Sequence, residues 1–273
     1  MFGEILARVQ EAHPLIHTIT NYVTANDCAN IVLACGASPI MADEEDEVQE
    51  ITALCSGLSL NLGTLNKAKI PALFLSGRTA NRRNIPALLD PVGVGASTLR
   101  TNTALDLLRE VQFTVIRANV SEMKALALGT CTASGVDASL CDRVTEENLS
   151  DAAAFCKAFS RKTGAVIAMT GQIDIVADCD RAYCIRNGNA MMSRVTGCGC
   201  QLSALTAAFV AADPDLPLEA AAAAVCAIGL AGEIAYKRLS SLDGNASYRN
   251  YIIDAIYHLT PEQLQKGANY ELR

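Results

Sequence analysis

Residues 195–206 read VTGCGCQLSALT, and the expected fold and site are built outward from this stretch. Gly197 and Gly199 stand where a helical pattern begins, and glycine lets backbone N–H groups approach a ligand closely. The first N–H groups of a helix have no partner inside it, and the helix dipole adds partial positive charge. The stretch therefore predicts a phosphate or oxyanion site at a helix N-terminus. An ordinary loop-to-helix junction is the alternative, because a lone G-x-G motif is a weak signal.

Three further segments carry polar side chains at the ends of apolar, strand-like runs. Asp90 ends the run ALLD ahead of the turn PVGVG, where it could serve a metal or a phosphate or cap a loop. Thr170 ends the run VIAM and is followed by Gly171. In open parallel sheets, ligands bind beyond the carboxyl ends of the strands, so these positions are where a site is expected.

The third segment, RANVSE, follows the run FTVI and has two interpretations. Asn119 and Glu122 are three residues apart, so they share one side of a helix start. Glu122 could be the glutamate of a capping box. With Arg117 it could instead serve a Mg²⁺–nucleotide complex, because Mg²⁺ prefers a few carboxylates together with phosphates and waters.

The rest of the chain alternates short apolar runs with longer helical patterns, which indicates an α/β fold with a mainly parallel sheet. The helix-like patterns occupy Phe2–Ala12, Ala25–Cys35, Glu44–Ser56, Leu99–Glu110, Glu122–Leu128 and Glu147–Thr163. After Gly199 the chain is helix-like almost to its end, with Glu219–Leu239 as a buried central helix. The strand-like runs occupy Leu58–Leu62, Ala87–Asp90, Phe113–Ile116, Val166–Met169, Ile173–Ala177 and Ala182–Ile185. The last two runs predict a hairpin about Asp178–Arg181.

Composition narrows the classes of protein that remain. The 273 residues fit a single domain, 1–273, without a linker or repeat. A net charge of −7 with no basic face argues against a nucleic-acid partner. The longest apolar run, Leu218–Ile228, is too short to cross a membrane. The N-terminus lacks the apolar core of a signal peptide. We expect a soluble, cytoplasmic protein.

The eleven cysteines are scattered through apolar runs, as small buried hydrophobic residues of a reducing compartment would be. They lack the short paired spacings of a structural zinc site. The sequence also lacks a P-loop, a nucleophile elbow and a dinucleotide-binding fingerprint.

The order of the motifs, DPVGVGA, then N-x-x-E, then TG, then G-x-G at a helix start, resembles the ribokinase-like superfamily. The N-terminal half narrows the resemblance, because HTITNYVTAN (17–26), GASPIMA (36–42) and NLGTLN (61–66) are similar to hydroxyethylthiazole kinases. The resemblance covers about residues 17–206. It implies a three-layer α/β/α fold, with a mainly parallel central sheet flanked by helices.

This resemblance also implies an activity and a set of site residues. The family transfers the γ-phosphate of ATP to 4-methyl-5-(2-hydroxyethyl)thiazole in thiamine salvage, as homotrimers with active sites between subunits. The residues that match its motifs divide by role: Arg117, Thr170 and Asn119 for ATP; Met41, Gly197, Asn21 and Val23 for the thiazole; Asp90 and Glu122 for Mg²⁺; Cys198, Gly199 and Cys200 for catalysis at the transferring phosphoryl group.

Cys200 stands where most ribokinase-like kinases have an aspartate base. A helix N-terminus lowers the pKa of a thiol, which would make Cys200 partly thiolate. Phosphoryl transfer has a loose transition state that needs little early proton removal, so we expect this residue to help without being indispensable. Packing as a small side chain is the alternative.

Three other functions compete with the thiazole kinase. A nucleotide-dependent lyase that repairs hydrated nicotinamide cofactors shares the superfamily but keeps the aspartate. A hydroxymethylpyrimidine kinase would not need the NYVT and ASPIM segments. A thiazole-sensing module without catalysis would not need Asp90, Glu122 and the Gly197–Cys200 turn.

Overall fold

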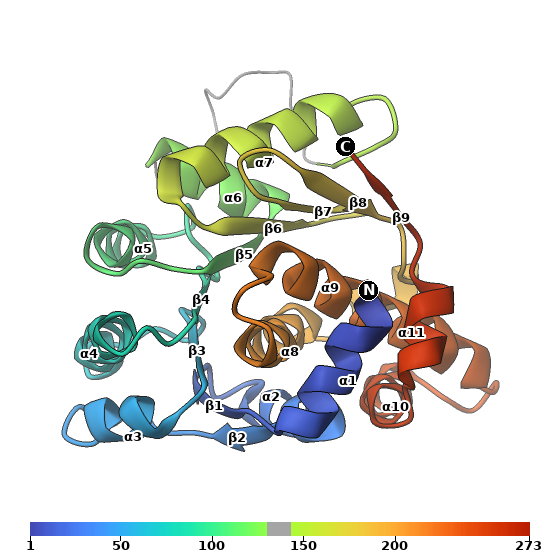
Figure 1. The fold of residues 1–273 in the computed structure, drawn as a ribbon, viewed down its shortest axis with the longest axis horizontal. Helices are drawn as coiled ribbons and strands as arrows, with labels where there is room; N and C mark the ends of the chain where they lie inside the picture. The colour runs from blue at the N-terminus through green and yellow to red at the C-terminus, as the bar shows by residue number, and fades with distance from the viewer. Residues whose placement is uncertain (130–142) are drawn as a thin grey trace.

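The computed structural model describes residues 1–129 and 143–273, and they fold around one nine-stranded sheet with the strand order β2-β1-β3-β4-β5-β6-β7-β8-β9 (Figure 1). All pairings from β2 through to β6 are parallel, and β7, β8 and β9 continue the sheet in antiparallel fashion. The strands are Leu15–Ile19 (β1), Ser38–Ile40 (β2), Gly57–Asn61 (β3), Ala87–Asp90 (β4), Val115–Asn119 (β5), Val166–Thr170 (β6), Asp174–Ala177 (β7), Ala182–Ile185 (β8) and Tyr270–Leu272 (β9).

Helices cover both faces of this sheet, so the expected three-layer α/β/α fold is confirmed (Figure 1). One face carries Val48–Leu54 (α3), Lys69–Arg82 (α4), Thr98–Glu110 (α5), Val120–Leu128 (α6) and Leu149–Thr163 (α7). The other carries Phe2–Ala12 (α1), Ala25–Ala34 (α2), Cys198–Ala212 (α8), Pro217–Arg238 (α9), Asn245–Tyr257 (α10) and Pro261–Gly267 (α11). A short 3₁₀ helix, η1 (Ala190–Arg194), precedes α8.

Each face has its own apolar core, because the central strands are buried on both sides. Leu58 and Leu60 of β3 pack with the core under α4 to α7, while Leu88 of β4 packs with the core under α8 and α9. Parallel strands covered on both faces read as continuous apolar runs, which is why β3, β4 and β6 could be predicted.

The helix α9 is long and apolar enough to cross a membrane, but 83% of its apolar window is buried inside the protein. It packs against α8, α10 and β6 to β8. The helix therefore forms part of the core, as the sequence indicated for Glu219–Leu239.

Five elements lie outside the predicted segments: β1, β2, α4, η1 and β9. The helix expected over Glu44–Ser56 is shorter, since α3 begins only at Val48 after an acidic stretch. The strand expected over Phe113–Ile116 is shifted, because β5 runs from Val115 to Asn119. That shift puts Arg117 inside the strand, with its side chain held by the neighbouring strands.

Candidate active site

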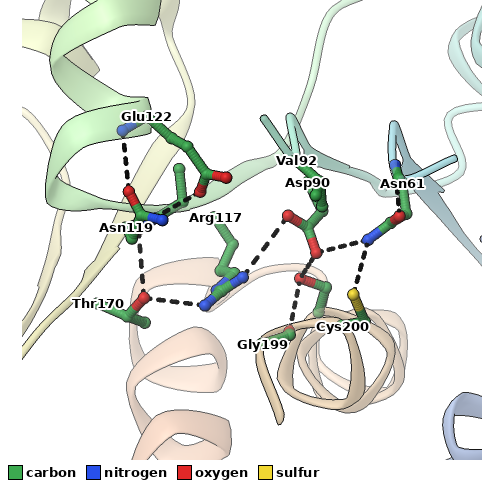
Figure 2. A network of polar contacts seen from close by, with 12 residues as sticks. Asn61, Asp90, Val92, Arg117, Asn119, Glu122, Thr170, Gly199 and Cys200 are labelled. Carbon is green, nitrogen blue, oxygen red and sulfur yellow. Dashed lines mark hydrogen bonds and ion pairs between the residues drawn. The ribbon is translucent and has the colours of Figure 1, made fainter. Parts of the chain in front are cut away.

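Four consecutive strands of the sheet end in polar residues at one edge. Asn61 of β3 lies opposite Asp90 of β4, and Asn119 of β5 lies opposite Thr170 of β6. Parallel strands in register end at the same edge, so these side chains form a row (Figure 2). The N-terminus of α8 meets this row, which brings together the strand ends and the glycine turn that the sequence singled out.

Asp90 is the buried centre of the row, with no exposed surface. Its Oδ2 accepts hydrogen bonds from Asn61 Nδ2 and Ser203 Oγ, both at 2.8 Å. Its Oδ1 has no hydrogen bond and lies 3.5 Å from a terminal nitrogen of Arg117. Burial raises the pKa of Asp90, and the Arg117 cation opposes that rise. The carboxylate therefore anchors both the arginine and α8.

Arg117 is the buried cation of the site. One terminal nitrogen donates to Thr170 Oγ1 at 2.9 Å, while the other faces Asp90 (Figure 2). A Cβ at Gly199 would lie 2.6 and 2.7 Å from the two terminal nitrogens of this guanidinium and 2.9 Å from its central carbon. Gly199 is thus required by close approach, since any side chain there would displace Arg117.

The first turn of α8, Gly197–Cys200, faces the same point. Gly197 is the N-cap, with a φ of 83° that favours glycine, and a Cβ on it would lie 2.3 Å from Thr24 Cγ2. No acidic side chain occupies the first turn of α8. The free N–H groups and the dipole of a fifteen-residue helix therefore act together with Arg117 on any anion placed between them.

Cys200 points its thiol toward two amides. Sγ accepts from Asn21 Nδ2 and Asn61 Nδ2, each at 3.3 Å. Burial, and then the nearby Asp90 carboxylate, raise the pKa of Cys200. The expectation that the helix N-terminus lowers this pKa is therefore wrong, because desolvation outweighs the dipole. Burial likewise raises the pKa of Cys198 to about 11, so both groups rest as neutral thiols.

Asn119 and Glu122 form a capping box at the start of α6, which confirms that interpretation of the pair. Asn119 Oδ1 accepts from the Glu122 N–H at 2.9 Å, and Glu122 Oε2 accepts from the Asn119 N–H at 3.1 Å. Glu122 Oε1 also accepts from the Gly93 N–H at 2.8 Å, which ties the turn after Asp90 to α6.

The structure contains no ready-made metal cluster within residues 1–129 and 143–273: no three His, Cys, Asp or Glu residues are grouped so that they could hold an ion. The magnesium role of Asp90 and Glu122 thus stays a prediction. A Mg²⁺ ion held mainly by phosphates and waters needs only one or two carboxylates, and the orphaned Oδ1 of Asp90 supplies an available oxygen.

A large cavity of about 900 Å³ opens beside Arg117 and α8. Arg117, Asn119 and Thr170 line it together with Gly199 and the segment 186–193. Its volume is at the upper end of the range for small-molecule sites. Three residues predicted to contact ATP thus share one cavity.

Asp174, at the start of β7, also lines this cavity. Its Oδ1 accepts from the Gly171 N–H at 2.9 Å, which fixes the turn after Thr170. Burial raises the pKa of Asp174 to about 7. A cavity residue thus titrates close to neutrality.

A second, smaller pocket of about 180 Å³ lies at the carboxyl ends of β1 and β2. We call it the small pocket; its lining includes Thr18, Thr20, Tyr22, Met41, Asp43, Asn66 and Lys69. The residues predicted to contact the acceptor lie at different places in the structure. Met41 lines the small pocket, Asn21 faces Cys200, and Gly197 contacts Thr24 at the mouth of α8. The Val23 side chain is 56% exposed on the surface of the chain.

Three residues with a place in these sites were missed in the sequence. Asn61 is shared by Asp90 and Cys200, and its signal was its position at the end of an apolar strand. Ser203 lies three residues after Cys200, one turn along the helix, so both face the same side. Lys69 gave no signal, because α4 itself was not predicted.

Comparisons with known proteins agree with this geometry. The family model described as "Hydroxyethylthiazole kinase family" matches residues 6–262. The hydroxyethylthiazole kinase of Clostridium acetobutylicum is 58% identical over 271 residues, which cover 99% of each chain. The solved structure of the hydroxyethylthiazole kinase from Pyrococcus horikoshii superposes with a TM-score of 0.88 at 32% identity, covering 100% of this chain and 98% of that one. A pyridoxal kinase from Staphylococcus aureus, solved with AMP-PCP and pyridoxal, has a TM-score of 0.61 at 14% identity, covering 95% of this chain and 98% of that one; it shares the fold.

Proposed function

The chain belongs to the hydroxyethylthiazole kinase family, and from this premise we propose that it transfers the γ-phosphoryl group of ATP to the hydroxyl of 4-methyl-5-(2-hydroxyethyl)thiazole, a step of thiamine salvage. One observation in this structure supports the proposal most directly. A buried cation, Arg117, lies between the free N–H groups of α8 and a cavity large enough for a nucleotide.

ATP occupies the large cavity in this proposal. Arg117, Thr170 and Asn119 contact its phosphates, and the segment 186–193 faces the rest of the nucleotide. Asp90 and Thr170 fix the guanidinium from two sides, so the cation is oriented before the substrate arrives. Preorganised charge of this kind is usually the largest single contribution to catalysis.

The N–H groups of Gly197–Cys200 receive the transferring phosphoryl group. Little covalent chemistry is required of the protein, because the transition state is loose. Orientation of the two substrates can therefore supply much of the rate, on the order of 7–11 kcal/mol in well-aligned systems. Cys200, as a neutral thiol held by Asn21 and Asn61, acts by position and not as a preformed base.

Asp90 and Glu122 are the proposed Mg²⁺ residues. The bound ion would neutralise charge on the phosphates. Both oxygens of Glu122 accept hydrogen bonds from backbone N–H groups, so Glu122 would act at a distance. Asp90 is bonded to Ser203 of α8 and is therefore nearer to the Gly197–Cys200 turn. The main contribution of this chain is to hold Arg117 and the Gly93 turn around the phosphates.

The acceptor enters from the side of Met41, Asn21 and Val23. Tyr22, Val23 and Met41 form an exposed apolar set, with 81%, 56% and 40% of their surfaces open. Large apolar side chains that gather around a site mark a contact surface. We therefore propose a homotrimer in which the neighbouring subunit closes each acceptor site. The particle should have three times the chain mass of 28.8 kDa. The proposed location is the cytoplasm.

The test measures ADP release by the purified chain with ATP, Mg²⁺ and one of three acceptors: the thiazole alcohol, hydroxymethylpyrimidine or hydrated NADH. We expect turnover with the thiazole alcohol and a product whose mass increases by one phosphoryl group. Preference for the pyrimidine, dehydration of NADH, or tight thiazole binding without ADP release would each replace the proposal with one of its rivals.

A further inference from the structure

The floor of the small pocket carries a buried lysine. Lys69 is 5% exposed and is the first residue of α4. Its Nζ donates to the Thr20 carbonyl oxygen, and its own N–H donates to Asn66 Oδ1 at 3.0 Å. A cation at the positive end of a helix, removed from water, is in an unfavourable place. Lys69 nevertheless lines the pocket. An ammonium group has three N–H donors, and the bond to the Thr20 carbonyl oxygen uses one of them.

A second observation points to a ligand in the same pocket. The Thr18 side chain is 3% exposed, lines the pocket, and its hydroxyl has no hydrogen-bond partner. Buried polar groups almost always have a partner, so an unpartnered hydroxyl in a cavity indicates that something polar binds there. A volume of about 180 Å³ suits a single-ring molecule, since a water takes about 30 Å³.

The titratable groups near Lys69 come from three neighbouring segments. Asp43, in the loop after β2, is exposed at the rim of the pocket; Tyr22 follows β1; and Cys200 lies on α8. Cys200 is a neutral thiol because burial raises its pKa. The Asp43 carboxylate is screened by solvent, whereas the buried ammonium is not. The interior of the pocket is therefore positive when Lys69 is protonated.

We propose that Lys69 is a specificity-determining residue that makes the acceptor site a charge filter: it admits a neutral heteroaromatic alcohol and rejects one whose ring carries a positive charge. This inference rests on the proposed thiazole acceptor. An N-alkylated thiazolium has the same hydroxyethyl arm, so only its charge and one substituent distinguish it. Two unit charges about 8 Å apart, at an effective dielectric constant of about 20, repel each other enough to weaken binding roughly 30-fold.

The filter weakens as pH rises. Burial lowers the pKa of Lys69 to about 8, while the Asp43 carboxylate acts in the opposite direction. The Lys69 side chain is a positively charged ammonium below this pKa and a neutral amine above it. Burial raises the pKa of the Cys200 thiol, so Lys69 is the group beside the pocket whose pKa lies near 8.

The experiment compares kcat/KM for 4-methyl-5-(2-hydroxyethyl)thiazole with that for its N-methyl thiazolium, using the full-length enzyme. We expect the native enzyme to prefer the neutral alcohol, K69M to lower that preference about 10- to 30-fold, and K69R to keep it. Lys67→Met, an exposed lysine two residues away, is the matched control and should leave the ratio unchanged. A ratio in K69M equal to that of the native enzyme would overturn the proposal.

The pH profile gives an independent answer if K69M folds poorly. The native ratio of the two kcat/KM values should fall between pH 7 and 9.5, and a flat ratio over that range would contradict the charge filter. Failure of the function itself looks different, because the native enzyme would then not phosphorylate the neutral alcohol at any pH.

Discussion

Replacing Gly199 tests how closely the α8 turn and Arg117 are fitted together. A Cβ there would come within 2.6 to 2.9 Å of the guanidinium, closer than a Cβ atom approaches other heavy atoms in folded proteins. Arg117 is a flexible side chain, so it would move and give up both its 2.9 Å bond to Thr170 and its 3.5 Å approach to Asp90. Loss of one preorganised donor to a developing charge costs about 10²–10³ in kcat.

Stability should change much less than activity in these variants. Gly199 lies in the first turn of α8 with an ordinary helical φ, and alanine is favoured over glycine in a helix by about 0.5–1 kcal/mol. That gain partly offsets the displaced arginine. We therefore expect Gly199→Ala to fold and lose about 100-fold in kcat, and Gly199→Val to fold with no measurable turnover.

The assay is ADP release under saturating ATP and thiazole alcohol, with melting followed by circular dichroism. Gly244 is the matched control, because it lies at the N-cap of α10 and a Cβ there meets nothing within 4 Å. Gly244→Ala and Gly244→Val should keep native turnover. A Gly199→Ala or Gly199→Val enzyme with native kcat would refute the fitted arrangement of α8 and Arg117.

Three further substitutions test neighbouring groups. Cys200→Ser keeps an acceptor for the two asparagine amides and should lower kcat less than tenfold; a loss of about 10²–10⁴ would instead indicate general-base catalysis by the thiol. Arg117→Lys keeps the charge but cannot reach Asp90 and Thr170 together, so kcat/KM for ATP should fall about 100-fold, and a native value would count against the two-sided anchoring. Asp174→Asn keeps the bond to the Gly171 N–H. The native pKa of about 7 lies above the ordinary value, so ionising Asp174 destabilises the fold as pH rises from about 4 to 7. The variant should melt above the native protein at pH 8 and level with it at pH 4, and an equal difference at both would contradict the raised pKa.

The parts of the fold that could be predicted are those whose signal is local. Runs such as ALLD and VIAM are buried on both faces, so their apolar content indicates strands directly. The strand β2 is three residues long and contains Pro39, and β9 is equally short, so neither has a period to detect. Their partners, β1 and β8, define them in three dimensions.

The helix α4 shows tertiary packing overriding local preference. Gly77 in the middle of its sequence argues against a helix, whereas Pro71 lies in the first turn, where the missing N–H costs no helical hydrogen bond. Gly77 packs so closely on Val111 that a Cβ would lie 2.6 Å from a Val111 methyl group, so the glycine serves helix packing. The sequence of residues 69–82 alone does not indicate that Gly77 packs against Val111.

The candidate site was predictable where it depends on strand ends and unpredictable where it depends on burial. The rule that ligands bind at the carboxyl edge of a parallel sheet selects Asp90 and Thr170 from the sequence alone. The predicted lowering of the Cys200 pKa was wrong, because burial raises this pKa. The start of a helix can be recognised in the sequence, whereas the burial of the thiol cannot. Lys69 was missed for the same reason, since its role needs the pocket around it.

The most direct test of the central claim is a crystal structure of the enzyme with a non-hydrolysable ATP analogue and the thiazole alcohol. We predict that the β- and γ-phosphates lie between the Arg117 guanidinium and the N–H groups of Gly197–Cys200, with the base in the large cavity. A triphosphate bound away from both, with Arg117 still paired only to Asp90 and Thr170, would contradict it.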